Sequence, residues 1–440
     1  MAISVLGRKI MKKISVSKEY EIKYITDIVV AGGGPSGVAA ATTAARLGKN
    51  VIIIEQSGTF GGASMLSGVP ELVNFDDGIE VISKGFGEEI FNSLEFDIKD
   101  SKYGHYYRPE VLKRLYDKLI CESGAKVLFY TRIVDAVCLD GCINQIIVSG
   151  NEGLYAIDAK CFIDCTGNGS LCALAGASYE YGDENEKTMS ATLCSLWAGV
   201  DFERKKMGSD GDNVENAYDD GVFSQYDTIL PGIKPNMPDV GVGGGNVGHC
   251  FGVDDRSTES LTEATFLGRK ILEEYETYYT KYVPGCENAQ LIRSADYIGI
   301  RESKRIKCEY TLNKDDFFKP EPFYDEIGRY SYPIDIHPLT SDKNGMDGFL
   351  NSISMRHEKG GSYSIPYRSL VPVDLKNVLV AGKTIGTDHY MQASVRVIPG
   401  CYITGQGAGV AAAVCVSDNT SCKDADINKI KEILKEITKK

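Results

Sequence analysis

Acid–base chemistry in this chain depends on few side chains, because its 440 residues include only five histidines. Imidazole changes its charge near neutral pH, so each histidine is a candidate for proton transfer. His337 follows Asp335 by two residues, which on a strand would place both side chains on one face. We predict an acid–base or hydrogen-bonding pair here, and the alternative, a strand-end pair that ties down a loop, stays open. The five are His105, His249, His337, His357 and His389.

Guanidinium groups could bind a carboxylate or phosphate substrate, because their fork of donors matches two oxygen atoms. Arg301 and Arg305 are four residues apart and would share a face if this stretch is helical, and Glu302 could neutralise one of them. We interpret this cluster as a structural ion-pair network. Substrate binding by Arg301 is the alternative.

The elements that must position these side chains begin with a glycine-rich turn. From Asp27 the apolar run IVVA leads into GGGPSG at 32–37 and then VAAATTAARLG, which predicts a strand, a tight turn and a helix. Gly34 would let the backbone approach a pyrophosphate, and the helix N-terminus favours phosphate charge. A second apolar strand at 51–54 ends in Glu55, the acid expected to bind ribose hydroxyls. The predicted dinucleotide contacts are Gly32, Gly34, Pro35, Ser36, Gly37, Glu55 and Gln56.

A second glycine string at 243–248 also fits the dinucleotide pattern, but its surroundings do not. It follows the proline-rich stretch LPGIKPNMPDV, runs into HCFGVDD and has no strand-end acid downstream. We predict a loop or a glycine-bearing strand here. The chain is therefore expected to have one dinucleotide site, which disfavours a reductase with its own NAD(P) domain.

From about Thr26 to about Ser417 the chain resembles the bacterial FAD-dependent oxidoreductases, distant relatives of the flavoprotein subunit of succinate dehydrogenase and fumarate reductase. The resemblance implies FAD as the cofactor. It rests on the strings SGTFGGAS at 57–64, FIDCTGNG at 162–169, IGIRESKRI at 298–306, YPIDIH at 332–337, IPYRSLVP at 365–372, NVLVAGKTIG at 377–386 and TGQGAGVAAA at 404–413. The further FAD contacts that it implies are Gly61, Gly62, Ala63, Ile133, Val134, Thr166, Gly167, Gly382, Gly405 and Gln406.

The last two strings carry the implications of this resemblance for the reaction site. The strand that ends near Gly382 would run toward the flavin. The helix opened by Gly405 would point its N-terminus at the flavin pyrimidine, where a helix dipole stabilises the negative charge of reduced flavin. Many relatives have a glutamate where this chain has Lys383, so no carboxylate role is carried onto that residue.

Two candidate catalytic residues lie between these last two elements. His389 and Arg396 occupy the turn from the strand to the helix, so we predict that they face the substrate above the flavin. His389 would handle a proton and Arg396 would polarise an anion or carbonyl. His337 and Arg301 are the alternative pair.

The resemblance also implies an α/β fold, in which a Rossmann-type FAD-binding domain of the glutathione-reductase kind carries an inserted α+β domain. We expect the FAD-binding domain at 24–180 and 365–418, the substrate or cap domain at 181–364, and a C-terminal docking helix at 419–440. Local patterns predict a helix from Pro109 to Gly124, an antiparallel meander at 126–160, and a helix at about 261–281 with a capping box of Ser260 and Glu263. The terminal helix would be capped by Asp424 or Asp426.

Composition excludes several other classes of protein. With 61 acidic and 48 basic residues, the net charge is -13, which works against binding to nucleic acid or anionic membranes. No apolar run approaches the roughly 20 residues of a membrane span, and the start lacks a signal-peptide core, so we expect a cytoplasmic protein. The 13 cysteines include no CxxC pair. We therefore expect no metal site, and thiols that pack in the core.

Together these patterns predict an FAD-dependent oxidoreductase, a dehydrogenase or reductase that exchanges a hydride between flavin N5 and a small polar metabolite. The sequence does not identify the electron acceptor. One alternative is an FAD-containing electron-transfer subunit of a larger redox complex. A flavin-dependent tRNA-modifying protein is disfavoured by the negative charge.

Overall fold

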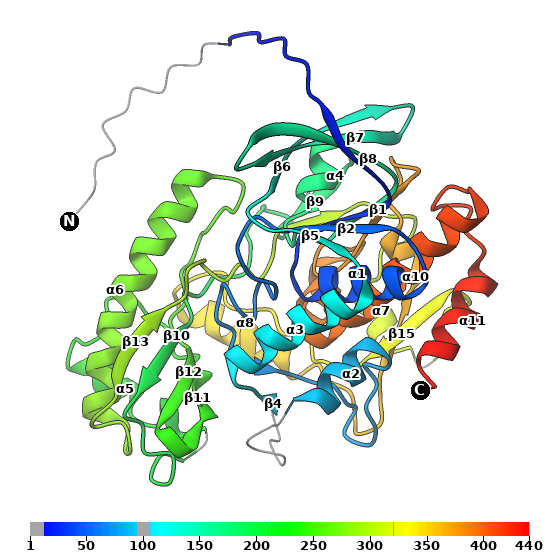
Figure 1. Cartoon of the computed structure of the whole chain (residues 1–440). Coiled ribbons are helices and arrows are strands. Elements are labelled where there is room, and N and C mark those ends of the chain that lie inside the picture. Colours follow the sequence, from blue (N-terminus) through cyan, green and yellow to red (C-terminus); the bar gives the residue numbers. More distant parts are fainter. Residues whose placement is uncertain (1–12, 95–104, 207, 320, 440) are drawn as a thin grey trace.

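A computed structural model describes residues 13–94, 105–206, 208–319 and 321–439 of the chain (Figure 1). Its main sheet has seven strands in the order β5-β2-β1-β8-β7-β6, and β17 pairs with β8. The strands are β1 (Ile22–Ala31), β2 (Val51–Ile54), β5 (Lys126–Leu128), β6 (Arg132–Leu139), β7 (Cys142–Gly150), β8 (Gly153–Asp164) and β17 (Val378–Val380). The fold is therefore α/β, as predicted.

Strand β8 belongs to both halves of this sheet. Its end, Phe162–Asp164, pairs in parallel with β17 and with the end of β1, whereas its first half pairs antiparallel with β7. The predicted meander at 126–160 is correct for β6, β7 and β8. It is wrong for β5, which pairs in parallel with β2 and so extends the parallel layer.

Helices α1 (Pro35–Arg46) and α10 (Ile398–Asp418) lie side by side against the parallel strands (Figure 1). Small residues allow this close approach, since a Cβ on Gly409 would lie 2.5 Å from the Ala40 carbonyl oxygen. Every residue of α10 from Ile398 to Cys415 is buried. No single helix in the described ranges is long and apolar enough to cross a bilayer, although α9 (His389–Val395) and α10, bent by 95°, pass together on length and composition.

A second hydrophobic core forms between residues 191 and 300. Helix α6 packs there on a four-stranded sheet of order β11-β12-β10-β13, and Trp197 meets Tyr279 with ring centroids 5.4 Å apart. The elements are β10 (Ser195–Ala198), α5 (Val214–Asp219), β11 (Gly232–Met237), β12 (Val242–Asn246), α6 (Thr258–Tyr282) and β13 (Gln290–Ser294).

The second glycine string is part of this sheet. It forms β12, as the glycine-bearing strand interpretation predicted, and β12 pairs antiparallel with β10 and β11. A Cβ on Gly245 would lie 2.6 Å from Trp197 Nε1, so the glycines here make room for neighbouring side chains. The capping box predicted from Ser260 and Glu263 is wrong: α6 begins one turn earlier, and the side chain of Ser257 accepts from the Ser260 amide.

The chain between the second core and α10 packs into the first core. Ile306, Phe317, Tyr330 and Tyr363 are buried members of that core, although they fall inside the predicted 181–364 domain. The predicted domain boundaries stay a prediction. The elements of this stretch are β14 (Lys304–Ile306), α7 (Lys314–Phe317), β15 (Glu326–Tyr330), α8 (Lys343–Ile353) and β16 (Tyr363–Pro366), and β14 pairs with β9 (Tyr179–Tyr181), which precedes the second core.

The remaining elements cover the first core. Helix α3 (Pro109–Ser123) ends at Gly124, whose φ of 83° is left-handed, and α11 (Ile427–Ile437) is capped by Asp426, both as predicted. The short elements are β3 (Glu71–Leu72), α2 (Phe86–Ser93), β4 (His105–Tyr106) and α4 (Ser170–Leu174). Ten of the 13 cysteines are buried and all 13 are free thiols, in line with the predicted core packing.

Candidate active site

The turn between β1 and α1 is shaped by glycines. Gly32 has a left-handed φ of 98°, and a Cβ on Gly37 would lie 1.9 Å from the Gly32 carbonyl oxygen. Gly34 differs, because a Cβ there would meet no described atom within 4 Å. Pro35 and Ser36 begin α1, whose first-turn amides have no intrahelical acceptors. The turn therefore presents an open backbone surface at Gly34.

Glu55 lies directly beside this turn. Its buried carboxylate accepts hydrogen bonds from the amides of Gly33 (2.8 Å) and Ser57 (2.7 Å), and each oxygen keeps a lone pair for a further donor. The Thr131 amide donates to the Glu55 carbonyl (3.1 Å), so the start of β6 lies next to it. On this side Gln56 and Val134 are exposed and Ile133 is half-buried.

Three other predicted segments meet the same turn. A Cβ on Gly62 would lie 3.1 Å from Gly34 Cα, and one on Gly382 would lie 2.8 Å from Ser36 Oγ. A Cβ on Gly32 would lie 2.9 Å from Thr166 Cα, and one on Gly167 would lie 3.8 Å from Cε of Lys383. Of the neighbouring predicted contacts, Gly61 donates its amide to the Gly33 carbonyl (2.8 Å), Ala63 is exposed, and Thr166 bonds through its amide (3.0 Å) and hydroxyl (2.7 Å) to Asp164.

The predicted start of the last helix is wrong. Helix α10 begins at Ile398, with Pro399 in its first turn, so Gly405 and Gln406 lie in its second and third turns and not at its N-terminus. Gly405 packs on Ser36, where a Cβ would lie 2.2 Å from the carbonyl oxygen. The Gln406 side chain accepts from the Phe86 amide (2.7 Å) at the start of α2. The helix starts earlier because proline is favourable in a first turn and the sequence after it is apolar.

His389 is paired with a buried carboxylate. Its Nδ1 lies 2.8 Å from Glu302 Oε1, and Arg305 Nη1 donates to the same oxygen at 2.6 Å. The predicted ion-pair network is thus confirmed for Arg305, and the stretch is not helical, since Lys304–Ile306 forms strand β14. The His389 side chain is 16% exposed and the Glu302 side chain 0%. Glu302 therefore fixes one nitrogen of an imidazole that remains accessible.

A second chain of polar groups runs through the buried interior. His249 Nδ1 lies 3.0 Å from both Asp227 carboxylate oxygens, and its Nε2 lies 2.8 Å from His337 Nδ1. His337 Nε2 in turn lies 3.4 Å from Asp335 Oδ2, which accepts from Arg396 Nη2 at 2.8 Å. The predicted Asp335–His337 pair therefore exists, although residues 331–338 form an irregular extended segment instead of the expected strand.

Burial and neighbouring charges set the protonation of this chain. Burial, together with the positive charge of Arg301, lowers the pKa of His337 to about 3. Burial alone would raise the pKa of Asp335, but His337, Arg396 and Arg301 hold it well below its ordinary value. The chain therefore contains a neutral His337 and an ionised Asp335 at neutral pH.

Arg301 makes a separate set of hydrogen bonds. Its Nη1 donates to the Ser190 carbonyl (2.7 Å) and Thr192 Oγ1 (2.9 Å), and its Nη2 donates to Asn246 Oδ1 (3.2 Å). Gln392, one turn after His389 on α9, donates from Nε2 to the Arg301 carbonyl (2.9 Å). Arg396 follows Gln392 by one turn, and its amide donates to the Gln392 carbonyl (3.2 Å). The four predicted catalytic residues, His389, Arg396, His337 and Arg301, therefore belong to neighbouring hydrogen-bonded groups, which we call the polar cluster.

Lys383 connects this polar cluster to the glycine turn. It directly follows Gly382, and its ammonium donates to the carbonyl of Ile300, the residue before Arg301. Burial lowers its pKa to about 8. No carboxylate in the described part of the chain forms an ion pair with it.

A family model described as FAD dependent oxidoreductase matches residues 27–434, which is almost the whole chain. The protein belongs to this family of FAD-dependent oxidoreductases. It is an enzyme of this family and uses FAD as its cofactor, as predicted.

Relatives and solved structures are more remote from this FAD-dependent oxidoreductase. It is 28% identical over 169 residues to the thiamine thiazole synthase of Methanococcus aeolicus, a match that covers 36% of the chain and 61% of the synthase. A 42-residue segment is 55% identical to the urocanate reductase of Eggerthella lenta, over 10% of the chain and 7% of that reductase. A geranylgeranyl bacteriochlorophyll reductase-like structure from Thermoplasma acidophilum has 14% identity and a TM-score of 0.45, covering 94% of this chain and 84% of its own.

The residues at the turn fit the cofactor of this family. The open surface at Gly34 is a place that any larger residue would fill, and the α1 N-terminus supplies amide donors and a favourable dipole for a pyrophosphate. Glu55 retains acceptor capacity for ribose hydroxyls. Gly34, Ser36, Glu55 and Gly62 would thus hold the adenosine diphosphate half of FAD in the oxidoreductase.

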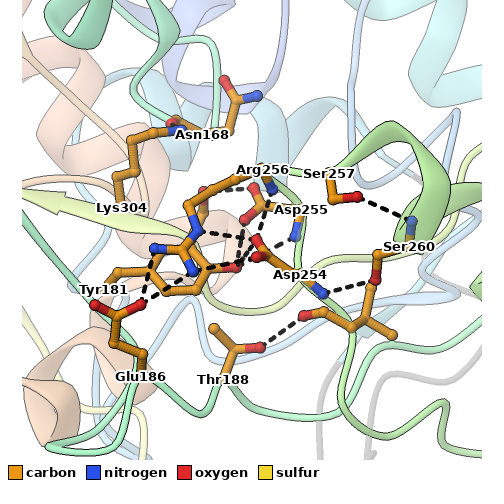
Figure 2. A network of polar contacts seen from close by, with 12 residues as sticks. Asn168, Tyr181, Glu186, Thr188, Asp254, Asp255, Arg256, Ser257, Ser260 and Lys304 are labelled. Carbon is orange, nitrogen blue, oxygen red and sulfur yellow. Dashed lines mark hydrogen bonds and ion pairs between the residues drawn. The ribbon is translucent and has the colours of Figure 1, made fainter. Parts of the chain in front are cut away.

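A further polar network ties the second core of the oxidoreductase to this region. Figure 2 shows Arg256, which stacks on Tyr181 at 3.7 Å and pairs with Asp254 (2.9 Å) and Glu186 (3.1 Å). Lys304 reaches the carbonyl of Asn168, in the turn after β8, at 3.3 Å (Figure 2). The network links the segment before α6 to β9 through Tyr181, and β9 pairs with β14, which carries Lys304. Among the described residues, no group of three or more His, Cys, Asp or Glu side chains could hold a metal ion.

Sequence reasoning missed several members of the polar cluster. Asp227 and Gln392 were not singled out, His249 was noted only as one of five histidines, and Glu302 was considered only as a partner for arginine. One signal was available for Gln392, since it follows His389 by three residues and so shares a helix face with it. No local pattern connects Asp227 with His249, because a loop and two strands separate them.

Proposed function

We propose that this FAD-dependent oxidoreductase exchanges a hydride between flavin N5 and a small polar metabolite. The observation that carries the proposal is that the Glu302–His389 pair and Arg301 adjoin Lys383, the residue after Gly382 at the glycine turn. Groups that can move a proton and bind a polar substrate therefore lie next to the residues that fit FAD. When bound, FAD supplies the two-electron redox chemistry.

His389 is the proposed site of proton exchange with the substrate. Its Nδ1 is held by Glu302, so Nε2 is the nitrogen left for the substrate, and its partial exposure keeps it accessible. Glu302 would act as a positioning residue, since it orients the ring and offsets the positive charge that forms when Nε2 takes a proton.

His337 is proposed to position other groups and not to react itself. Both of its ring nitrogens are occupied, by His249 and by Asp335, and its side chain is 7% exposed. Through Asp335 it fixes Arg396, whose charge is already compensated there. Of the two arginines, Arg301 is therefore the better candidate for direct contact with the substrate.

We also propose a type of FAD domain, an inserted substrate domain and a kind of substrate for this protein. The parallel strands continued by the β6–β8 meander support a glutathione-reductase-like FAD domain, and the separate core at 191–300 supports an inserted substrate domain. We also propose that the protein is distantly related to the flavoprotein subunit of succinate dehydrogenase. A small polar substrate, without nucleic acid or membrane as partner, fits the net charge of -13.

Anaerobic screening tests this function. The purified yellow protein is mixed with a panel of polar metabolites, and loss of flavin absorbance reports reduction without knowledge of the acceptor. We expect one chemical class to bleach the flavin, and NADH or NADPH alone to do so poorly, because β12 is not a second dinucleotide site. Recovery of FMN alone or of colourless protein would contradict FAD binding. Reduction only by a partner protein would favour the electron-transfer subunit.

A further inference from the structure

Arg301 differs from the other arginines of the polar cluster in having no charged partner. Arg305 pairs with Glu302 and Arg396 with Asp335, whereas Arg301 donates only to neutral oxygens of Ser190, Thr192 and Asn246. Within the ranges that the structure describes, no carboxylate forms an ion pair with Arg301. Burial, with the nearby charge of Arg396, lowers its pKa to about 10, so it is a cation at neutral pH.

Arg301 is half-buried, and a cation that loses part of its hydration without gaining a counter-charge is unfavourable. Three of the five N–H donors of the Arg301 guanidinium are used by its three hydrogen bonds. The two that remain, one on Nε and one on Nη2, have no hydrogen-bond partner among the described residues. A planar anion with two oxygens would satisfy both the charge and these donors.

Three neighbours of Arg301 carry buried polar atoms that also lack partners in the described chain. They are Ser190 Oγ, Arg396 Nε and Gln392 Oε1. The Ser190 carbonyl accepts from Arg301, the Gln392 side chain donates to the Arg301 carbonyl, and the Arg396 amide donates to the Gln392 carbonyl (3.2 Å). Buried groups of this kind are uncommon in native proteins, and an ordered water, an ion or a ligand can satisfy them; these three lie on residues that contact or neighbour Arg301. Two of the three are donors, suited to an anion, and Gln392 Oε1 is an acceptor.

We propose that Arg301, Ser190, Arg396 and Gln392 form a subsite for a substrate carboxylate with a hydroxyl or amino group next to it. The carboxylate would accept from Arg301 and from the free donors of Ser190 and Arg396. The adjacent hydroxyl or amino group would donate to Gln392 Oε1. This inference rests on the proposed function, because it names the class of polar metabolite that the same site takes.

Binding without turnover tests the subsite. The FAD-loaded protein is titrated anaerobically with glycolate, lactate and glycine, with acetate, and with glycolamide, and binding is followed by the flavin difference spectrum and by calorimetry. We expect saturable binding of at least one 2-hydroxy or 2-amino acid, weaker binding of acetate, and none of the uncharged glycolamide. The loss of a buried charge pair corresponds to about 2–5 kcal/mol, so Arg301→Gln should weaken binding by about 30-fold to 5000-fold.

Matched variants separate binding from folding. Arg293→Gln removes an exposed arginine that pairs with Asp296 and should leave binding unchanged. Gln392→Leu should bring glycolate and acetate to similar affinities, because it removes the acceptor for the hydroxyl. If Arg301→Gln is recovered without FAD, Ser190→Ala provides the test, with an expected loss of about 3-fold to 10-fold for one hydrogen bond.

Several outcomes would overturn the subsite. They are equal binding of glycolate and glycolamide, carboxylate binding that survives Arg301→Gln, or no saturable binding by any acid in the panel. A shift in flavin midpoint potential in Arg301→Gln, together with no carboxylate binding in the wild type, would assign the charge to the cofactor instead. Failure of the proposed function would give a different result, namely a protein without FAD or a flavin that no metabolite bleaches. Calorimetry measures carboxylate binding whether or not the flavin is reduced.

Discussion

The glycine turn and the polar cluster adjoin each other but are built on different principles. The turn depends on side chains that are absent, at Gly32, Gly34 and Gly37, within one short stretch of chain. The cluster depends on side chains that are present and charged, brought from segments as far apart as Ser190 and Arg396. Shape therefore determines the first region and electrostatics the second. Substitutions should separate cofactor retention from turnover along this boundary.

The largest expected effect follows from filling the open surface of the turn. Gly34→Leu should abolish FAD retention, with a loss of at least about 1000-fold in affinity, because the new side chain would occupy the pyrophosphate position. The fold should survive, since Gly34 has an ordinary φ of -69° and a Cβ there meets no described atom within 4 Å. Released-cofactor chromatography and circular dichroism measure the two effects. Gly348→Leu, on the exposed face of α8, is the control.

The next effect should fall on turnover alone. His389→Ala should retain FAD but lower the rate with the identified substrate by about 10²-fold to 10⁴-fold, the usual contribution of a positioned acid–base group. Stopped-flow reduction of the bound flavin measures it. Tyr390→Phe, which changes the exposed neighbour on the same helix, should react normally. A His389→Ala enzyme with an unchanged rate would show that electrostatics at this position do not serve the reaction.

Lys383, at the boundary of the two regions, should give a pH-dependent effect on stability. Burial lowers its pKa from 10.5 to about 8. Below pH 8 both the folded and unfolded chains hold the proton, and the full penalty of the buried charge is present. Between about pH 8 and 10.5 only the folded chain loses it, so wild-type stability rises with pH.

Lys383→Met should therefore raise the free energy of unfolding at pH 7 by on the order of a few kcal/mol. The thermal midpoint should rise with it. Its advantage should shrink toward pH 10.5. Scanning calorimetry across this range measures it, with Lys118→Met as the control because that side chain is 64% exposed. An advantage that does not change with pH would mean that packing, and not charge, limits this position.

The smallest expected effect lies outside both regions. Ser257→Ala should lower the unfolding free energy by about 1 kcal/mol, because it removes the N-cap of α6. FAD content and turnover should stay at wild-type values. Denaturant unfolding measures the change. Thr262→Ala, whose hydroxyl only bonds back to the Thr258 carbonyl on the exposed helix surface, should have no comparable effect.

The two regions also differ in how far the sequence could predict them. The turn is local: strand, glycines, helix and Glu55 lie within about 30 residues, and each has one steric or electrostatic reason to be there. The start of α10 was misplaced because glycine spacing alone does not separate a helix N-terminus from a helix packed tightly on a neighbour. Gly405 serves the second purpose, in contact with Ser36.

The polar cluster could be predicted only in part. The Asp335–His337 pair and the Glu302–Arg305 pair are close in sequence, and both were expected. His249 and His337 are 88 residues apart, and no periodicity connects an isolated histidine with another on a different segment. The unpaired charge of Arg301 is also invisible in the sequence, where Glu302 stands directly beside it but faces Arg305 and His389.

The packing of α1 against α10 has a consequence for how the protein is made. Lys49, just after α1, contacts Ser417 near the end of α10, and 368 residues separate them. During synthesis α1 leaves the ribosome long before α10, the helix that packs against it. The small apolar face of α1 therefore stays exposed until α10 is available. Contacts between segments so far apart in the sequence also form slowly. The face of α1 that packs against α10 is covered only after α10 has been synthesised.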